Sequence, residues 1–251
     1  MLNVTLASMR HWFRLVGSAS PGARVVERDG VAAAVVPAAP ERAVVNSVHY
    51  EDADGLDAAY DEIAAAYDEI GAVWTVWVPS QDERARAVLQ RAGHVLDAEP
   101  AVMEVDLRGG VERPPAGALE DWTADGDVAE VGPLNDRAYT FRTDSFTRAF
   151  AALPPDEITT YAARLDGVAA GCLMIVDHEA NADVEMVAVL PEARGHGMAG
   201  KLLGHALADA AERGLETSTL ASTKLGRPVY ERLGYRQFDT LEMWEKRPTT
   251  T

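Results

Sequence analysis

The chain has 251 residues, of which 47% are hydrophobic and 25% are charged, the balance of a globular protein rather than a disordered or fibrous one. This length is comfortable for two domains of ordinary size. Lys and Arg number 23 against 40 Asp and Glu, which gives a formal net charge of −17. Such a charge repels phosphate backbones and anionic lipid headgroups, so neither nucleic acid nor a membrane is an expected partner.

The chain has one cysteine, Cys172, which lies in the apolar run 171–176. An intrachain disulfide and a cysteine-based zinc site are therefore excluded, and we expect no metal. No apolar stretch is long enough to span a membrane. Arg10, His11 and Arg14 interrupt the first apolar residues, which is not the pattern of a secretory signal. We expect a cytoplasmic protein.

The first part of the chain reads as a helix followed by alternating strands and helices. Apolar residues at helical spacing predict an amphipathic helix within the first 16 residues. Gly71 and Gly93 stand where two later helices should end. The expected elements are a hairpin (24–28 and 31–36), a strand (44–50), a helix (56–70), a strand (73–78), a helix (82–92) and a strand (102–107). Residues 108–115, rich in Gly and Pro, read as a linker.

The second part predicts the same order of elements. A hairpin (161–165 and 168–176) leads to a strand (183–189), a helix from about 195 to 213, a strand (217–222) and a helix (228–233), followed by further strands. Asp166-Gly167 repeats Asp29-Gly30, Gly234 repeats Gly93, and Met243 repeats Met103, in the same order and at nearly constant offset. The chain therefore reads as an α/β protein (α+β, with a mixed sheet) of two tandem domains, residues 1–110 and 111–251.

The segment 187–203 is the most informative for chemistry, because a strand turns through a glycine-rich loop and opens a helix. A helix N-terminus presents unpaired N–H groups and favours anions. Gly195 and Gly197 let a ligand approach the backbone, and Arg194 adds donors suited to phosphate. A mononucleotide P-loop would need a hydroxyl after Lys201, which is absent. A dinucleotide fingerprint would need an acid at the end of the strand 217–222, which is also absent.

This segment resembles the GNAT superfamily of acetyl-CoA-dependent N-acetyltransferases. The family signature [QR]-x-x-G-x-[GA] is met by Arg194, Gly197 and Ala199, and the later Y-x-x-x-G-[FY] is met by the segment from Tyr230 to Tyr235. The resemblance covers about 111–247. It implies two tandem GNAT-like domains, of which the second is catalytic and the first is a degenerate copy.

The resemblance implies transfer of an acetyl group from acetyl-CoA, a co-substrate, to an amine of a small molecule or peptide. The amine attacks the thioester directly in a ternary complex. The alternative is a non-catalytic acyl-CoA-binding or scaffold protein that keeps the fold, and a homodimer is left open. The positions implied to bind acetyl-CoA are Val187, Ala188, Val189, Arg194, Gly195, His196, Gly197, Met198, Ala199, Gly200 and Ser222.

Two residues are implied to be catalytic. By its family position Tyr230 is the acid that protonates the leaving thiolate. The alternative is that Tyr230 is an aromatic residue that only packs its amphipathic helix. Glu185 is the leading base, directly or through a water, against the alternative of a solvated acid at a strand start. Side chains alternate along a strand, so Asp183 shares the face of Glu185 and is its substitute.

Two further expectations concern the acceptor pocket and the first half of the chain. In the family, the first helices of the catalytic domain line the acceptor pocket, here about 135–146. Its Tyr139, Phe141 and Phe146 would frame the amine and Asp144 would hold a cation, or the aromatics simply pack the helices. In the first half, Glu51, Asp52 and Asp54 stand where phosphate donors belong, and Leu89 takes the position of Tyr230. This half should therefore not bind CoA.

Overall fold

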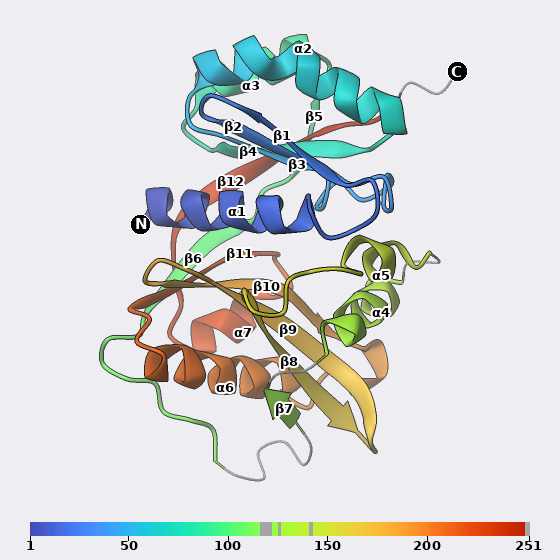
Figure 1. The fold of residues 1–251 in the computed structure, drawn as a ribbon. Helices are drawn as coiled ribbons and strands as arrows, with labels where there is room; N and C mark the ends of the chain where they lie inside the picture. Colours follow the sequence, from blue (N-terminus) through green and yellow to red (C-terminus); the bar gives the residue numbers. More distant parts are fainter. Residues whose placement is uncertain (116–121, 125–126, 141–142, 249–251) are drawn as a thin grey trace.

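The computed structural model describes residues 1–115, 122–124, 127–140 and 143–248. The molecule has two lobes that lie one above the other, with the N-terminal helix between them (Figure 1). The described elements are, in chain order, α1 (Leu2–Val16), β1 (Arg24–Arg28), β2 (Val31–Val35), β3 (Ser47–Tyr50), α2 (Ala53–Ile70), β4 (Trp74–Pro79), α3 (Glu83–Arg91), β5 (Val95–Ala98), β6 (Ala101–Asp106), β7 (Trp122–Ala124), α4 (Val128–Ala138), α5 (Ser145–Ala149), β8 (Ile158–Leu165), β9 (Val168–His178), β10 (Asn181–Val189), a short 3-10 turn (Pro191–Ala193), α6 (Met198–Glu212), β11 (Thr217–Ser222), α7 (Arg227–Arg232) and β12 (Arg236–Lys246).

The strands form one continuous mixed sheet, as the α/β prediction requires. Its order is β1-β2-β3-β4-β12-β6-β11-β10-β9-β8-β7, with β5 beside β12. The pairs β3–β4 and β10–β11 are parallel, and the other pairs are antiparallel. The two parallel pairs occupy equivalent places in the two halves of the chain. The internal repeat read from the sequence is therefore a structural repeat.

The two halves exchange strands where they meet. β6 comes from the first half of the sequence, but it pairs with β11 and with the first part of β12. In return, Leu241–Lys246 of β12 pairs with β4, and part of the same segment pairs with β5. Each lobe is therefore completed by a strand from the other half of the sequence. The expected domain boundary at residue 110 stays a prediction. Strands from before residue 110 pair with strands from after it in both lobes.

The hydrophobic cores follow the same exchange. Met103 of β6 is fully buried in the larger core, which also holds Trp12 and Phe13 of α1 and the apolar face of α6. Trp244 of β12 lies in the smaller core, between the first-half sheet and α2. α1 packs on β2 and β3 of one lobe and on β9 and β10 of the other. The Asn181 amide of β10 donates to the Ser8 hydroxyl of α1 at 3.0 Å.

The described helices include none that is long and apolar enough to cross a membrane. Helix starts differ slightly from expectation. α2 begins at Ala53 rather than 56, because the Asp52 side chain accepts a hydrogen bond from the Gly55 N–H and caps the helix. α6 begins at Met198 rather than near 195, because Gly195 and Gly197 both have positive φ and belong to the preceding loop.

The strand exchange predicts that residues 111–251 do not fold as a separate fragment. That fragment lacks β6, which leaves β11 and β12 with unpaired edges, and it lacks the α1 residues of its own core. We expect it to be insoluble when expressed alone and to become soluble when residues 1–110 are co-expressed. A fragment 99–251, which retains β6, separates the loss of the strand from the loss of α1. A soluble 111–251 fragment with a cooperative unfolding transition would contradict this prediction.

Candidate functional site

The site is built where the parallel strands β10 and β11 part. Their pairing covers only residues 181–183 of β10 against 217–219 of β11. Beyond it, β10 carries a bulge between Glu185 and Ala188, and Met186 adopts φ +53°. A positive φ at a side-chain-bearing residue is uncommon and marks a locally enforced conformation. The bulge turns the end of β10 away from β11.

The bulge leaves the backbone of Val187 and Val189 turned away from β9. Leu190 donates to the Ala170 carbonyl of β9, and peptide groups alternate in direction along a strand. The Val187 carbonyl accepts from the Tyr139 hydroxyl at 3.2 Å, and the Val189 carbonyl accepts from Arg194 at 3.1 Å. The N–H groups of Val187 and Val189 point to the same side as their carbonyls. This strand edge can therefore pair with an extended ligand.

The loop after β10 ends at an open helix N-terminus. Gly197, with φ +73°, is the N-cap of α6, which has no side-chain cap and no acidic residue in its first turn. The first N–H groups of the helix are therefore available to an anion. A Cβ at Gly195 would meet nothing within 4 Å, so the space over the loop is open. The geometry fits a phosphate-bearing ligand.

Arg194 makes contacts that the sequence did not predict. Its guanidinium donates to the Val189 carbonyl and, at 2.8 Å, to the Ala138 carbonyl at the end of α4. It thus ties the loop to two neighbouring elements. The expected contact with phosphate stays a prediction, and the geometry shown is that of a residue that holds the loop in place.

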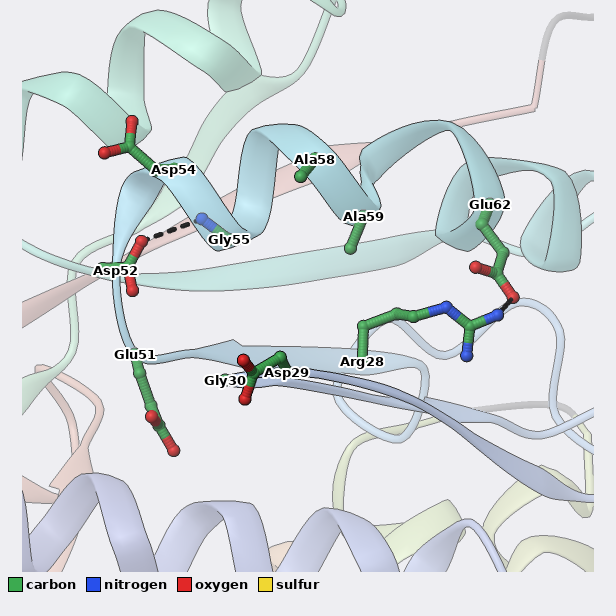
Figure 2. Close-up of a pocket in the computed structure, with 10 residues that line it drawn as sticks. All are labelled: Arg28, Asp29, Gly30, Glu51, Asp52, Asp54, Gly55, Ala58, Ala59 and Glu62. Atoms are coloured by element: carbon green, nitrogen blue, oxygen red, sulfur yellow. Dashed lines mark hydrogen bonds and ion pairs between the residues drawn. The ribbon is translucent and has the colours of Figure 1, made fainter.

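The equivalent helix of the first half, α2, has a closed N-terminus (Figure 2). Asp52 accepts from the Gly55 N–H at 2.8 Å, and Asp54 adds a second negative charge in the first turn. A depression of about 590 Å³ beside it is lined mainly by carboxylates, those of Asp29, Glu51, Asp52, Asp54 and Glu62. Arg28, which also lines it, forms an ion pair with Glu62. At α2 the Asp52 carboxylate occupies a helix N–H group, and the surrounding carboxylates would repel an anion. At α6 the equivalent N–H groups are open.

Tyr230 of α7 lies half-buried, with its ring edge-on to Tyr235 at 6.0 Å between centroids. Its ring covers Gly226, where an added Cβ would come within 2.9 Å of the ring and 3.4 Å of the hydroxyl. The same point lies 3.5 Å from the hydroxyl of Ser222, which is buried and donates to the Thr223 carbonyl. The end of β11 and the start of α7 therefore meet at the Tyr230 hydroxyl. Leu89 of the first half is fully buried instead.

Asp183 and Glu185 form a carboxylate pair on one face of β10. Asp183 is 2% exposed; its Oδ1 accepts from the Thr219 hydroxyl at 3.3 Å, and its Oδ2 has no partner among the described residues. Burial raises the pKa of Asp183, and burial together with the Asp183 charge raises the pKa of Glu185. Burial, followed by Tyr139 and Glu185, also raises the pKa of Tyr230.

The comparisons with known proteins agree with this geometry. Residues 156–237 match the family described as "Acetyltransferase (GNAT) domain", a stretch that includes β10, the α6 loop and Tyr230. This part of the chain is a GNAT domain. No curated protein matches the chain.

Solved structures resemble the whole chain. One is a GCN5-related N-acetyltransferase from Kribbella flavida, at 18% identity over 98% of this chain and 96% of that one, with a TM-score of 0.67. A second, from Sphaerobacter thermophilus, matches at 16% identity over 88% and 78%, with a TM-score of 0.60. A tandem GNAT protein from the clavulanic acid biosynthesis pathway matches at 17% identity over 99% and 96%, with a TM-score of 0.57. These likenesses establish the fold, and its tandem arrangement agrees with the last of them.

Two residues at the C-terminal end of α4, which precede the matched stretch, contact the bulge in ways that the sequence did not predict. The amide of the buried Asn135 donates to the Met186 carbonyl at the bulge at 3.2 Å. Tyr139, expected in the acceptor pocket, instead donates to the bulge at Val187 while 48% of it stays exposed. Cys172, buried as expected, lies 3.6 Å from the Asn135 amide, and burial raises the pKa of its thiol to about 12.

Two of the expected acceptor-pocket residues, which also precede the matched stretch, make other contacts. Phe146 is 3% exposed and stacks on Phe150 in the core, so here the packing alternative is correct. Asp144 forms an ion pair with Arg148 rather than standing ready for a cation. Phe141 lies outside the described residues. Among the described residues there is no group of three or more His, Cys, Asp or Glu side chains that could hold a metal ion.

Proposed function

We propose that the chain is an acetyl-CoA-dependent N-acetyltransferase that acts on a small-molecule or peptide amine through its second half. The family and the fold support acyl transfer in general. The observation that carries the finer proposal is the contrast between the open N-terminus of α6 and the Asp52-capped N-terminus of α2. The second half offers a site for the pyrophosphate of acetyl-CoA beside Glu185 and Tyr230, and the first half does not.

The bulged end of β10 would hold the pantetheine arm of acetyl-CoA. Its Val187 and Val189 N–H groups can pair with the amide carbonyls of the arm as an added strand would. A backbone N–H here would also stabilise the oxyanion that develops on the thioester carbonyl. The pyrophosphate would then lie on the N–H groups of the α6 loop, around Gly195–Gly200.

Glu185 would accept the proton that the acceptor ammonium must lose. A base acts best when its pKa lies near the working pH, and burial beside Asp183 moves the Glu185 pKa upward from its usual acidic range. The neutral amine then attacks the carbonyl carbon of the thioester and forms the new C–N bond. Collapse of the tetrahedral intermediate breaks the C–S bond and releases a thiolate. The nitrogen loses its second proton as the amide forms, and this proton replaces the one that Tyr230 gives to the sulfur.

Tyr230 would donate its proton to that thiolate. Its raised pKa keeps the phenol protonated at neutral pH, as an acid must be before the thiolate forms. The hydroxyl lies where β11 ends and α7 begins, beside Ser222. The same raised pKa argues against Tyr230 as the base.

A thiol-release assay over a panel of primary amines tests the function, with Tyr230→Phe as the diagnostic variant. The variant keeps the ring and removes only the proton donor, so kcat should fall by roughly 10²–10⁴ while acetyl-CoA affinity is nearly unchanged. Tyr60→Phe in the first half is a matched control that should leave kcat unchanged. Tight acetyl-CoA binding with no amine turned over would support the non-catalytic alternative. A Tyr230→Phe kcat within a factor of two of wild type would remove Tyr230 from the acid role.

The pH dependence of kcat tests Glu185 as the base. Activity should fall as the pH drops through the Glu185 pKa, because a protonated carboxyl cannot accept a proton. Asp183→Asn removes a negative charge that raises this pKa, so the acidic limb of the profile should move to lower pH. Asp177→Asn, at the end of β9 and paired with Arg213, is the control and should leave the limb in place. An unmoved limb in Asp183→Asn would contradict the assignment.

A further inference from the structure

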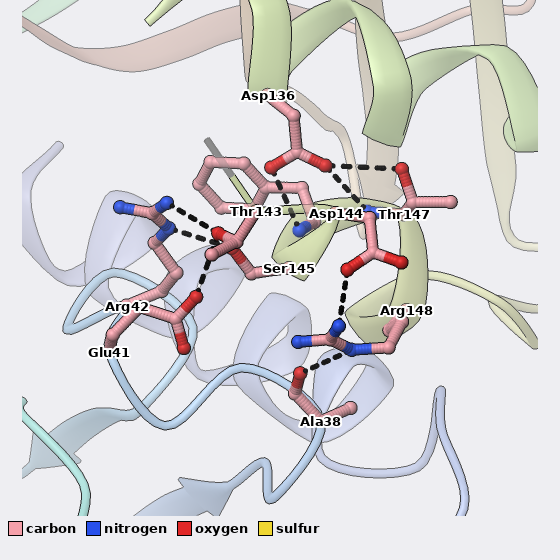
Figure 3. A network of polar contacts seen from close by, with 10 residues as sticks. Ala38, Glu41, Arg42, Asp136, Thr143, Asp144, Ser145, Thr147 and Arg148 are labelled. Atoms are coloured by element: carbon pink, nitrogen blue, oxygen red, sulfur yellow. Dashed lines mark hydrogen bonds and ion pairs between the residues drawn. The ribbon is translucent and has the colours of Figure 1, made fainter. Parts of the chain in front are cut away.

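A polar network joins the first half of the chain to the helix pair α4–α5 of the second (Figure 3). The Arg42 guanidinium donates from Nε to the Ser145 hydroxyl and from Nη2 to the Thr143 hydroxyl, both at 3.0 Å. Thr143 in turn lies 2.9 Å from a Glu41 carboxylate oxygen. The guanidinium also lies over the Phe146 ring, 5.8 Å from its centroid. One arginine side chain thus contacts three residues at the start of α5.

The loop that carries Arg42 is fixed from within the first half. Asn46 is fully buried, and its amide donates to the Ala39 carbonyl at 2.8 Å and to the Arg42 carbonyl at 3.1 Å. Its side-chain oxygen accepts from the Val36 N–H at 2.8 Å. The backbone of Arg42 is therefore held by a satisfied buried side chain, which suits it to act as a fixed anchor.

On the other side of the network, α5 and α4 form one unit. Asp136 of α4 is 5% exposed and accepts from the backbone N–H groups of Phe146 and Thr147, at 3.1 and 3.2 Å. The helices approach so closely that a Cβ at Gly132 would lie 2.5 Å from the Thr147 Cα. A displacement of α5 would therefore carry α4 with it.

α4 leads from this network to the reactive end of β10. Asn135 and Tyr139 bind the carbonyls of Met186 and Val187, the two residues within the bulge. The Ala138 carbonyl receives Arg194 from the α6 loop. Hydrogen bonds, joined through the backbones of α5 and α4, therefore connect Arg42 to the bulge and the anion-binding loop.

We propose that Arg42 is a positioning residue for the acetyltransfer site: by holding Thr143 and Ser145 it sets the place of α4–α5 over the bulge of β10. The inference rests on the proposed function and gives the first half a part in catalysis without a site of its own. It also makes the position of the bulge depend on an interface between the two halves. Arginine suits this task, because its planar fork reaches two hydroxyls at once and lysine offers only a point charge.

Other contacts hold the halves together when Arg42 is lost. Arg148 donates to the Ala38 carbonyl at 3.0 Å, and the Ala152 N–H donates to the Ala19 carbonyl at 2.7 Å. The exchanged strands β6 and β12 are also untouched by this substitution. Arg42→Ala should therefore fold, and its effect should be confined to the position of α4–α5.

The test combines kinetics and hydrogen exchange on the full chain. In Arg42→Ala, amides of residues 143–149 should exchange about tenfold faster or more, as expected when charge-assisted hydrogen bonds are lost. With the amine turned over fastest in the panel, KM for acetyl-CoA should rise about tenfold, because a displaced α4 no longer holds the Met186 and Val187 carbonyls and Arg194 in place. Arg42→Lys should recover part of this loss. Thr143→Val, which removes one acceptor from the other side, should reproduce part of it and should not add fully to Arg42→Ala.

Arg24→Ala is the matched control, because Arg24 pairs with Glu69 inside the first half and does not reach α5. It should change neither the exchange of 143–149 nor the KM for acetyl-CoA. Unchanged exchange of 143–149 in Arg42→Ala would overturn the proposal even if no amine in the panel were turned over, so it can fail independently of the proposed function. An unchanged KM for acetyl-CoA in Arg42→Ala would overturn it as well, since the bulge and the α6 loop would then keep their geometry without Arg42.

Discussion

The sheet of this protein is continuous across its centre only because each half of the chain supplies a strand to the other. An open strand edge exposes unpaired N–H and C=O groups and invites association with other chains. β6 fills the place beside β11 in the lobe that carries the GNAT domain, and the end of β12 fills the place beside β4 in the other lobe. Loss of the first half would therefore open the sheet that positions Glu185 and the α6 loop.

Within this continuous sheet, the two halves differ most in the first turn of one helix, α6 in the second half and α2 in the first. Both place a helix after a strand whose parallel pairing is short, β10 with α6 and β3 with α2. α6 starts with two glycines of positive φ and leaves its N–H groups open. α2 starts with an aspartate that bonds one of those groups and places negative charge over the rest. This local difference in sequence leaves the N-terminus of α6 open and the N-terminus of α2 capped and negatively charged.

Local patterns were sufficient to predict most elements and the two ends of the site. Glycine positions and apolar spacing placed α6, β11 and α7, and alternation along β10 placed Asp183 and Glu185 on one face. The strand exchange could not be predicted, because the residues of β12 carry the same alternation whichever strand they pair with. It depends on contacts between segments that are far apart in the sequence.

The polar contacts around the bulge could not be predicted from the sequence either. Arg194 was expected to face phosphate, but its donors reach the carbonyls of Val189 and Ala138, which no side-chain pattern reveals. Phe146 was offered as a pocket residue, but the interface with the first half buries it under Arg42. Such roles follow from which elements pack together, and the strand exchange that decides this is itself non-local.

The central claim is that acetyl-CoA binds at the α6 loop and nowhere else in the chain. Calorimetric titration of the full chain with acetyl-CoA tests it most directly, with Gly197→Val and Gly55→Val as the paired variants of the two helix N-termini. Valine at Gly197 would place a β-branched side chain at a positive φ where the pyrophosphate should lie. The account predicts one acetyl-CoA per chain, lost in Gly197→Val and kept in Gly55→Val. A stoichiometry of two, or unchanged affinity in Gly197→Val, would contradict it.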